Sequence, residues 1–564
     1  MLDTQQFIDN HYPALSNHKL IHGSAIRIVK RLLNEKELNA FSEKYPHLTG
    51  FEFVEQVLSH FSFGYRTNHF QLENIPDTGK LVIIANHPIG TLDGLALIDC
   101  VKQVRSDIKV VANTMLMAVD ALHELLLPVN NMKGNTAKQQ LKAIHHHLHN
   151  AGVVIMFPSG EVSRLRPQGV RDTKWQSGFL RIAKSNKCPI LPIHINAKNS
   201  PMFYGMSMLN KSLATTLLVK EMFHQKNKII DFSIGEVIPF ESYSTLPFSF
   251  TEQVKLFKKH LYRLAKGKKP IFQTQKAIAL SEDRRSIYKD LQKYAERLGE
   301  TSDGKIIYLY RYQNNSAILR ELGRLRELTF RAVGEGTHQR RDIDKYDKDY
   351  FHLILWDNQD LEIAGAYRFA EVAKLHNEGK QIYSQSLFDY TPNMQPFFER
   401  GLELGRSFVQ QKYWGKRSLD YLWQGIGAFL NKHQEYQFLF GPVTISGQFP
   451  VLATDLIVDF FSHYFPTLQP LAKPKIPYKV CDTHKQDYTN MSYSEGLKHL
   501  KIQLANMDVV LPTLFKQYAE LCEPGGVTFA GFNLDPNFQN CIDGLVMVEV
   551  AKIKEKKRKR YINN

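Results

Sequence analysis

The chain has 564 residues, more than one hydrophobic core normally supports, so we expect two or three domains. Its composition, 43% hydrophobic and 23% charged, is ordinary for a soluble globular protein, and no apolar stretch is uninterrupted enough to span a membrane. The formal net charge of +16 predicts acidic partners, but no nucleic-acid-binding motif accompanies it, which argues against nucleic acid as a partner.

The first residues show no basic segment followed by an apolar one, so no signal peptide is predicted. The five cysteines are odd in number and far apart, which indicates neither a disulfide framework nor a metal site and favours the reducing cytoplasm. Residues 1–75 have a helical pattern, with amphipathic pieces at 26–33 and 51–61. Such pieces are more often helices packed on a core than helices lying on a membrane, although the basic face of the first permits either.

The first predicted strand, residues 81–85, leads into a histidine and an aspartate. His87 follows the end of the strand, and Asp93 stands at the start of the next predicted helix. A neutral imidazole can take the proton of a hydroxyl that attacks an acyl carbon, and a carboxylate can orient the ring and stabilise the imidazolium. The pair therefore suggests acyl transfer to an alcohol. The alternative is that both residues only shape the turn and cap the helix.

Two further strands are predicted at residues 152–157 and 189–194. The first of these runs into Pro158-Ser159-Gly160-Glu161, with Arg164 shortly after it, and Trp175 is expected on a helical stretch. The strands thus deliver several polar groups to one edge of a sheet.

The order of a His–Asp pair, then Phe-Pro-x-Gly and Pro-Ile-x-Pro, within residues 60–240 resembles the glycerol-phosphate and lysophospholipid acyltransferase superfamily. The resemblance implies that His87 is the general base and that Asp93 orients it. It also implies an acceptor-binding block after the second strand, made here of Ser159, Gly160 and Glu161. Arg164, with Arg166 and Arg171, is a candidate for binding an anionic head group or carrier, although a solvated basic face is the commoner explanation of such a run.

This sequence departs from the superfamily pattern in two places. Five residues separate His87 from Asp93 where the family norm is four, a variant associated with a subgroup that acylates amino-acid lipids. Ser159 stands where the family has a glutamate, and Glu161 lies two positions further on. The first departure indicates an amino-acid lipid as the acceptor. The second changes which side chain is available to bind that acceptor.

The C-terminal half begins with a different pattern, in which a hairpin is predicted from strands at 351–356 and 363–369. A helix at 419–431 and a strand at 438–441 follow. Charged and aromatic residues recur at definite spacings around these elements: Arg326 and Phe330, Asp342, Asp344 and Asp347, Arg368, and Glu403 and Arg406.

This ordered spacing resembles the acetyltransferase-like (GNAT) superfamily, in the branch of acyl-homoserine-lactone synthases and ornithine N-acyltransferases. The implied chemistry is attack by an amine on a thioester, with Glu403 as the base that takes the ammonium proton. Asp344 and Asp347 are candidates for binding the cationic groups of an amino acid. Arg368 and Arg406 are candidates for binding its carboxylate, because a planar guanidinium fits a carboxylate bidentately. The alternative is a set of structural ion pairs.

Members of that branch take their acyl group from acyl carrier protein, so the resemblance implies an acyl-carrier-protein thioester as donor, with no permanently bound cofactor and no metal. The usual glycine-rich phosphopantetheine loop is replaced here by Gly415-Lys416-Arg417. Backbone donors in this loop are still expected to face the phosphate of the carrier, with Arg417 accommodated beside it.

A basic patch at 266–270 and a polar stretch at 273–285 mark the end of the first domain. We therefore expect an α/β protein of two domains, an acyltransferase-type mixed sheet flanked by helices followed by a GNAT-like mixed α/β domain. The predicted divisions are a helical N-terminal region at 1–75, an O-acyltransferase-like domain at 76–270, a linker at 271–290, an N-acyltransferase-like domain at 291–551 and a basic tail at 552–564.

The fusion of the two patterns resembles bifunctional ornithine-lipid synthases. It implies N-acylation of ornithine with a 3-hydroxyacyl chain by the second domain and O-acylation of the new hydroxyl by the first. The alternatives are a lysophosphatidic-acid-type acyltransferase fused to an unrelated N-acyltransferase, a glycine- or lysine-lipid synthase, and a non-enzymatic membrane scaffold. Seven bases and one acid in residues 552–560 suggest peripheral binding to the anionic inner face of a bacterial cytoplasmic membrane, although a solvated tail explains them equally well.

Overall fold

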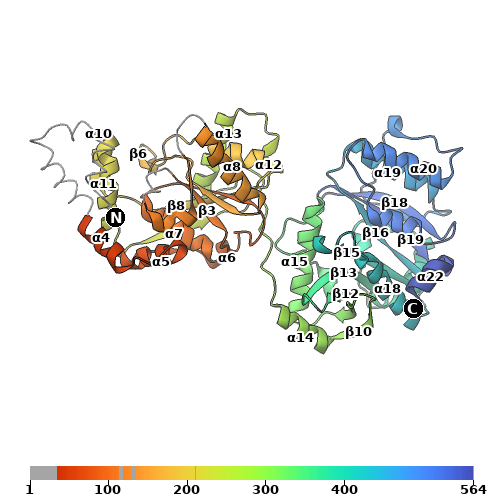
Figure 1. The fold of residues 1–564 in the computed structure, drawn as a ribbon. Helices are drawn as coiled ribbons and strands as arrows, with labels where there is room; N and C mark the ends of the chain where they lie inside the picture. The colour runs from red at the N-terminus through yellow and green to blue at the C-terminus, as the bar shows by residue number, and fades with distance from the viewer. Residues whose placement is uncertain (1–34, 113–118, 130–134, 210, 315, 563–564) are drawn as a thin grey trace, which may run out of the picture. The chain divides into compact units, whose positions relative to one another are not determined.

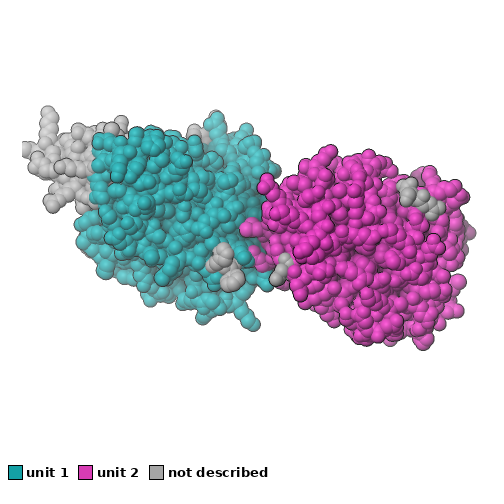
Figure 2. All heavy atoms as spheres, turned by 90° about the horizontal axis from the view of Figure 1, so that it is seen from below, with its two compact units in different colours: residues 1–277 teal, residues 278–564 magenta. Residues whose placement is uncertain are grey.

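The chain folds as two compact units, residues 1–277 and 278–564 (Figure 2). The computed structural model describes residues 35–112, 119–129, 135–209, 211–314 and 316–562. The division at 277–278 falls inside the segment 271–290 that we predicted as a linker. The amphipathic segment predicted at 26–33 lies outside the described residues.

Unit 1 is built on a seven-stranded mixed sheet (Figure 1). Five strands are parallel to one another, and the two at one edge run in the opposite direction. All three strands predicted in this half are confirmed. The order across the sheet is β1 (Gly64–Arg66), β9 (Ile229–Ile234), β8 (Ile190–Asn196), β2 (Leu81–Ala85), β5 (Val153–Met156), β3 (Ile108–Ala112) and β4 (Leu126–Pro128).

The central strand β2 is buried on both faces because helices cover both sides of the sheet. Leu81 and Ile83 pack on one face with helices α5 (Gly50–His60) and α7 (Thr91–Lys102). Val82 and Ile84 pack on the other face with α8 (Asn135–His149), α9 (Gly178–Ser185) and α13 (Phe250–Leu264). This explains the continuous apolar run of β2, since a strand between two helical layers has no solvent face.

Shorter elements complete unit 1. The segment predicted as a helix at 51–61 is confirmed as α5, and the range predicted as helical also contains β1. Trp175, expected on a helix, lies instead in the loop before α9. The remaining elements are α4 (Glu35–Lys44), α6 (His69–Leu72), the 3₁₀ turn η2 (Asp120–Leu125), β6 (Arg164–Arg166), β7 (Gly169–Arg171), α10 (Pro201–Leu209), α11 (Lys211–His224) and α12 (Glu241–Ser244).

Unit 2 is built on an eight-stranded sheet in which every neighbouring pair is antiparallel except β15 and β16. The predicted hairpin is confirmed as β12 and β13. The order is β10 (Ala295–Glu300), β11 (Ile306–Arg311), β12 (Phe351–Asp357), β13 (Glu362–Glu371), β15 (Gly401–Val409), β16 (Phe438–Ile445), β19 (Cys541–Glu549) and β18 (Val527–Asp535). The structure thus confirms the predicted architecture of two α/β domains with mixed sheets flanked by helices.

Helices cover both faces of this sheet as well (Figure 1). Helices α14 (Arg284–Tyr294) and α15 (Ala317–Ala332) pack on one face. The opposite face carries α18 (Ser418–Lys432), α19 (Val451–Tyr464), α20 (Tyr493–Ala505), α21 (Thr513–Ala519) and α22 (Glu555–Tyr561). The short elements are η3 (Lys345–Lys348), α16 (Val372–Asn377), η4 (Tyr383–Ser386), β14 (Phe388–Tyr390), η5 (Pro392–Met394), α17 (Gln395–Arg400), η6 (Gln411–Tyr413), β17 (Ala472–Pro474), η7 (Asp482–His484) and η8 (Val550–Lys552).

The two parallel strands of unit 2 diverge soon after they begin. The β15–β16 register runs only from Gly401 to Glu403, whereas β16 continues along β19 as far as Ile445. Gly441 lies at the point of divergence, and a Cβ atom there would overlap the carbonyl oxygen of Leu404. Glycine therefore allows the backbones to approach here before they separate, and β15 has no pairing with β16 beyond residue 403.

The basic segment predicted as a C-terminal tail is folded over its described residues. Tyr561 and Ile562 are buried, and the Tyr561 hydroxyl donates a hydrogen bond to Asp420 of α18 at 2.6 Å. Arg560 forms an ion pair with the same carboxylate. Deletion of the segment would therefore expose core side chains as well as remove charge. Within the described residues, no helix has both the length and the apolar character needed to cross a bilayer.

Candidate active sites

The predicted histidine–aspartate pair of unit 1 is assembled at the carboxyl end of β2. His87 Nδ1 lies 2.9 Å from Asp93 Oδ1, and Asp93 is completely buried in the first turn of α7. The other oxygen of Asp93 accepts hydrogen bonds from the backbone N–H groups of Ile89 at 2.8 Å and Gly90 at 3.3 Å. Gly90 has φ +105°, which side-chain-bearing residues rarely adopt, so this donor arrangement depends on glycine.

The environment of His87 determines how strongly it binds a proton. Burial disfavours the imidazolium, but the negative charges of Asp93 and Asp172 outweigh burial and raise the pKa of His87 above its ordinary value. With Nδ1 held by Asp93, Nε2 is the nitrogen left to accept a proton from a substrate. The His87 side chain is 23% exposed, so it is not closed off from solvent.

Sequence reasoning missed a second carboxylate beside His87. Asp172 Oδ1 accepts hydrogen bonds from the His87 backbone N–H at 3.2 Å and from the Ser163 hydroxyl at 2.6 Å. Its Oδ2 accepts one from Trp175 Nε1 at 2.7 Å. The Ser163 N–H in turn donates to the His87 carbonyl at 2.7 Å. Asp172 lies 85 positions after His87, so no local spacing marks it.

The predicted acceptor block forms the loop after β5. Ser159 is buried, and its hydroxyl donates to the Glu161 carbonyl at 2.6 Å; Gly160 is exposed with φ +64°. The Glu161 carboxylate accepts a hydrogen bond from Thr173 at 2.6 Å and lies 3.6 Å from Arg164. The Phe157 ring lies 4.4 Å from that of His87, so this loop borders the histidine.

Arg164 is the most unusual member of the block. Its side chain is 10% exposed, and its guanidinium packs over the ring of Phe203. Two of its nitrogens, Nε and Nη1, are buried without a hydrogen-bond partner among the described residues. Buried guanidinium nitrogens normally find acceptors, so the arrangement suits a group with acceptor oxygens supplied from outside the chain.

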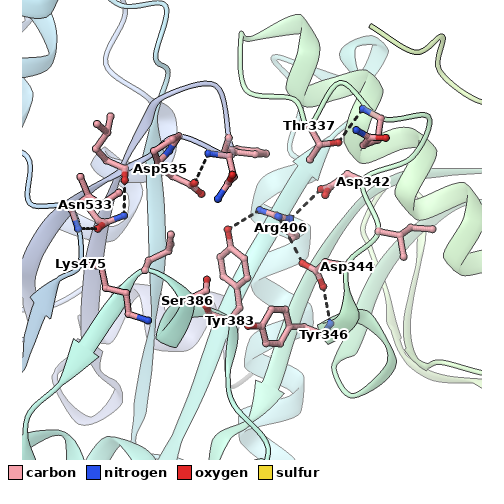
Figure 3. Close-up of a pocket in the computed structure, with 18 of the residues that line it drawn as sticks. Thr337, Asp342, Asp344, Tyr346, Tyr383, Ser386, Arg406, Lys475, Asn533 and Asp535 are labelled. Carbon is pink, nitrogen blue, oxygen red and sulfur yellow. Dashed lines mark hydrogen bonds and ion pairs between the residues drawn. The ribbon is translucent and has the colours of Figure 1, made fainter. Parts of the chain in front are cut away.

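Unit 2 contains a pocket of about 340 Å³ between the loop after α15, η4 and the end of β18 (Figure 3). Of the residues predicted here as substrate ligands or as the base, Asp344 and Arg406 line it, whereas Asp347, Arg368 and Glu403 do not. The remaining polar and charged residues that line it include Thr337, Arg341, Asp342, Tyr383, Lys475, Asn533 and Asp535.

Arg406 projects into this pocket from a bulge in β15. The register with β13 shifts between Ala366 and Arg368, and Arg406 has φ +49°, a strained value for an arginine. Its Nε lies 3.1 Å from Asp342 and its Nη2 3.7 Å from Asp344, while Nη1 donates to the Tyr383 hydroxyl at 3.4 Å (Figure 3). The bulge directs the guanidinium into the pocket.

Asp347 and Arg368 belong to a buried network. Arg326 Nη1 donates to Asp347 at 2.7 Å, and Arg368 Nη1 donates to Asp347 at 3.0 Å and to Asp344 at 2.7 Å. Burial acts in the opposite direction, but the two guanidinium groups hold the pKa of Asp347 far below its usual range. His352 completes the network, with its Nε2–H donating to the Asp347 carbonyl at 2.8 Å. Here the structural ion pairs considered as the alternative are present, and through Asp344 they support the pocket.

Glu403 lies behind Tyr383 and holds the pocket wall. Its carboxylate accepts hydrogen bonds from the backbone N–H of Tyr383 at 3.0 Å and of Ser384 at 2.7 Å, and from the Tyr350 hydroxyl. Burial raises the pKa of Glu403, while these hydrogen bonds act in the opposite direction. Glu403 is therefore in contact with a pocket-lining residue without lining the pocket itself.

Further carboxylates near Arg406 were given no role from the sequence. Asp535 lines the pocket, and burial raises the pKa of Asp543, on the neighbouring strand, to about 6. Burial and the charge of Asp543 raise the pKa of Glu335 to about 8. The described residues contain no group of three or more His, Cys, Asp or Glu side chains that could hold a metal ion.

Two family models of known proteins match separate parts of the chain. Residues 7–269 match the family model described as an acyltransferase, and residues 325–424 match that of the acetyltransferase (GNAT) domain. The lyso-glycine lipid O-acyltransferase of Bacteroides thetaiotaomicron is 26% identical over 264 residues, which cover 45% of this chain and 95% of that protein. The glycine N(alpha)-acyltransferase of the same organism is 28% identical over 312 residues, covering 52% of this chain and 88% of that protein.

A third relative is the L-ornithine N(alpha)-acyltransferase of Agrobacterium fabrum, 28% identical over 234 residues, which cover 40% of this chain and 73% of that protein. The chain thus combines an N-terminal acyltransferase domain with a C-terminal GNAT domain, and it is an acyltransferase.

Proposed function

We propose that this acyltransferase makes a di-acylated amino-acid lipid in two steps. Unit 2 transfers a 3-hydroxyacyl chain to the α-amine of ornithine, and unit 1 then esterifies the new hydroxyl with a second chain. The observation that carries the proposal is that one chain holds both a His87–Asp93 pair, suited to an alcohol acceptor, and the Arg406 pocket, suited to an amino acid. The product of the second site is a substrate for the first.

The relatives support this pairing of steps. Bacteroides thetaiotaomicron has separate proteins named glycine N(alpha)-acyltransferase and lyso-glycine lipid O-acyltransferase, and both resemble this chain. Two activities that lie on two proteins in that organism are proposed to share one polypeptide here.

In the first step the α-ammonium loses a proton, its nitrogen attacks the thioester carbonyl, and the carrier thiol leaves with a proton. Arg406 binds the amino-acid carboxylate, and Asp344 binds the ammonium before deprotonation. Glu403 is proposed as the base. Because it does not line the pocket, it takes the proton through a relay past Tyr383, and its raised pKa makes it a stronger base than an ordinary glutamate.

The charges around the pocket favour an acceptor with a cationic side chain. Arg341 is already paired with Glu282, at 3.1 Å, and Lys475 donates to the Gln385 carbonyl at 2.6 Å. Asp535 accepts a backbone hydrogen bond from Asn537, but no cation is recorded beside it among the described residues. The terminal ammonium of ornithine would supply that cation, whereas glycine would leave the carboxylate unpaired.

The acyl donor of the first step is proposed to bind between β15 and β16, beyond the residues at which the two strands pair. Backbone groups of β15 beyond residue 403 can pair with the extended pantetheine arm as a strand would. The loop 415–417 precedes the N-terminus of the fifteen-residue helix α18, where backbone amides favour a phosphate. A donor carried on acyl carrier protein also suits the charge of +16, because such carriers are acidic.

In the second step the 3-hydroxyl of the mono-acylated lipid gives its proton to His87 Nε2 as its oxygen attacks the second thioester. Asp93 stabilises the imidazolium that forms, and the imidazolium returns the proton to the departing thiol. Arg164 binds the carboxylate of the amino-acid head group through its unpartnered nitrogens.

Expression of the chain in a host that lacks amino-acid lipids tests the proposal. Mass spectrometry of the lipid extract should show a new phosphorus-free lipid that contains ornithine and two chains. A glycine or lysine head group would correct the acceptor and keep the two steps. Altered phosphatidic acid with no amino-acid lipid would favour a lysophosphatidic-acid-type enzyme, and an unchanged lipid extract would contradict the proposal.

Peripheral membrane binding is proposed through exposed basic residues of the C-terminal helix. Because deletion would expose the core, charge reversal is the sharper test: Lys556→Glu with Lys559→Glu should weaken binding to anionic vesicles, since each base near such a surface contributes about 1 kcal/mol. The matched control reverses Lys473 and Lys479, which are exposed elsewhere in unit 2. Equal vesicle sedimentation of the two double variants at low salt would contradict this assignment.

A further inference from the structure

Asp172 holds the peptide of the proposed catalytic histidine from one side. Its Oδ1 accepts the His87 backbone N–H, and the Ser163 hydroxyl bound to the same oxygen leads to the Ser163 N–H, which donates to the His87 carbonyl. Both polar groups of the His87 backbone are thereby tied to the β6–β7 region. A rotation of this backbone would move the imidazole, so the bonds limit where Nε2 can lie.

Asp172 is itself fixed by elements on two further sides. Trp175 Nε1 donates to Oδ2, the Asp172 N–H donates to the Tyr262 hydroxyl at 2.9 Å, and Lys258 Nζ donates to the Asp172 carbonyl at 2.7 Å. The carboxylate is only 2% exposed. A buried acidic side chain is costly unless it is fully hydrogen-bonded, and three donors satisfy this one.

We propose that Asp172 is a positioning residue for the O-acylation site, which orients the His87 backbone and stabilises the imidazolium through its negative charge. Asp93 contacts the ring, whereas Asp172 accepts a hydrogen bond from the backbone of the same histidine. The inference rests on the proposed role of His87 as the base of the second step.

The neighbouring charges determine whether loss of the Asp172 charge raises or lowers the pKa of His87. The groups that act on the protonation of His87 are the carboxylates of Asp93 on α7 and Asp172 after β7, and both favour the charged ring. Burial raises the pKa of Asp172, while the hydrogen bonds from Ser163 and Trp175 act in the opposite direction and favour the ionised carboxylate. Loss of its charge should therefore lower the pKa of His87.

The test replaces the charge while keeping the shape. In Asp172→Asn alone, the new amide group would face Trp175 Nε1, another donor, so the main variant combines Asp172→Asn with Trp175→Phe. The control is Trp175→Phe alone, which keeps the carboxylate. The midpoint of the His87 titration is measured by NMR on the full chain with labelled histidine, with the His87→Gln spectrum assigning the signal.

The double variant should titrate about one pH unit lower than the control, the low end of the range for an opposite charge nearby. The acid limb of kcat/KM for esterification of mono-acylated ornithine lipid should shift by the same amount. Equal midpoints in the two proteins would overturn the inference and leave Asp172 a purely structural residue. If the double variant does not fold, the His87 midpoint of the single Asp172→Asn variant is measured instead. A midpoint equal to that of the control would again overturn the inference.

The NMR titration needs no substrate, so the two proposals fail separately. A shifted midpoint in an enzyme that does not esterify the mono-acylated lipid would contradict the proposed function and support the action of Asp172 on His87. Esterification of the mono-acylated lipid with an unshifted His87 midpoint would support the proposed function and contradict the action of Asp172 on His87.

Discussion

Replacing His87 with alanine should stop the second acyl transfer while the first continues, so that the mono-acylated, hydroxyl-bearing lipid accumulates. The expected loss in di-acylated product is about 10²–10⁴-fold, the usual contribution of a general base. Asp93→Asn should cause a smaller loss, because the amide keeps the size of the side chain but removes the charge beside Nδ1. The measurement is mass-spectrometric quantitation of both lipids in cells that make each variant.

His87→Gln provides a control of similar size that also lacks a base. Equal stability of the variants, shown by thermal unfolding, would exclude loss of the fold as the cause. If His87→Ala still yields the di-acylated lipid, or removes the mono-acylated one as well, then unit 1 does something other than esterify the product of unit 2.

The second large effect is expected in unit 2. Arg406→Ala should abolish both lipids, because the carboxylate of the amino acid loses its ligand and Asp342 and Asp344 are left without that cation. Glu403→Gln should also abolish both, since it removes the proposed base and disturbs the hydrogen bonds that position Tyr383 and Ser384. No second transfer can follow because its hydroxyl acceptor is never made.

Arg341→Ala is the matched control, since Arg341 lines the same pocket but is paired with Glu282. Supplying mono-acylated ornithine lipid to the Arg406 and Glu403 variants should restore the di-acylated product, which separates loss of the first step from loss of the fold. Wild-type amounts of the final lipid in either variant would remove that residue from the mechanism.

The His87–Asp93 pair could be predicted because it is a local feature. Only five residues separate the two, and a strand followed by a turn and a helix places them together in any fold that keeps these elements. Asp172 could not be found in this way. It reaches His87 only after the β6–β7 hairpin has folded back, and neither its spacing nor its neighbours in sequence mark that contact.

The charged residues of unit 2 show a different limit of prediction from the sequence. Their spacing predicted that they belong together, and the structure places Arg326, Asp347 and Arg368 in one network. Spacing does not distinguish a charge that faces a cavity from one that is neutralised behind its wall, because that depends on burial. The basic C-terminal segment was ambiguous for a similar reason: its lysines and arginines dominate the sequence, but Tyr561 and Ile562 make it part of the core.

The strand order of unit 2 also bears on how the chain is made. Strand β19 lies inside the sheet, between β16 and β18, although it is among the last segments to be synthesised. Unit 2 therefore cannot complete its sheet until nearly all of its 287 residues have left the ribosome, about 15–60 s after unit 1 at ordinary elongation rates. During that interval the nascent protein would already carry the compact unit that contains His87, so premature termination would release the proposed O-acylation site without the unit proposed to supply its acceptor.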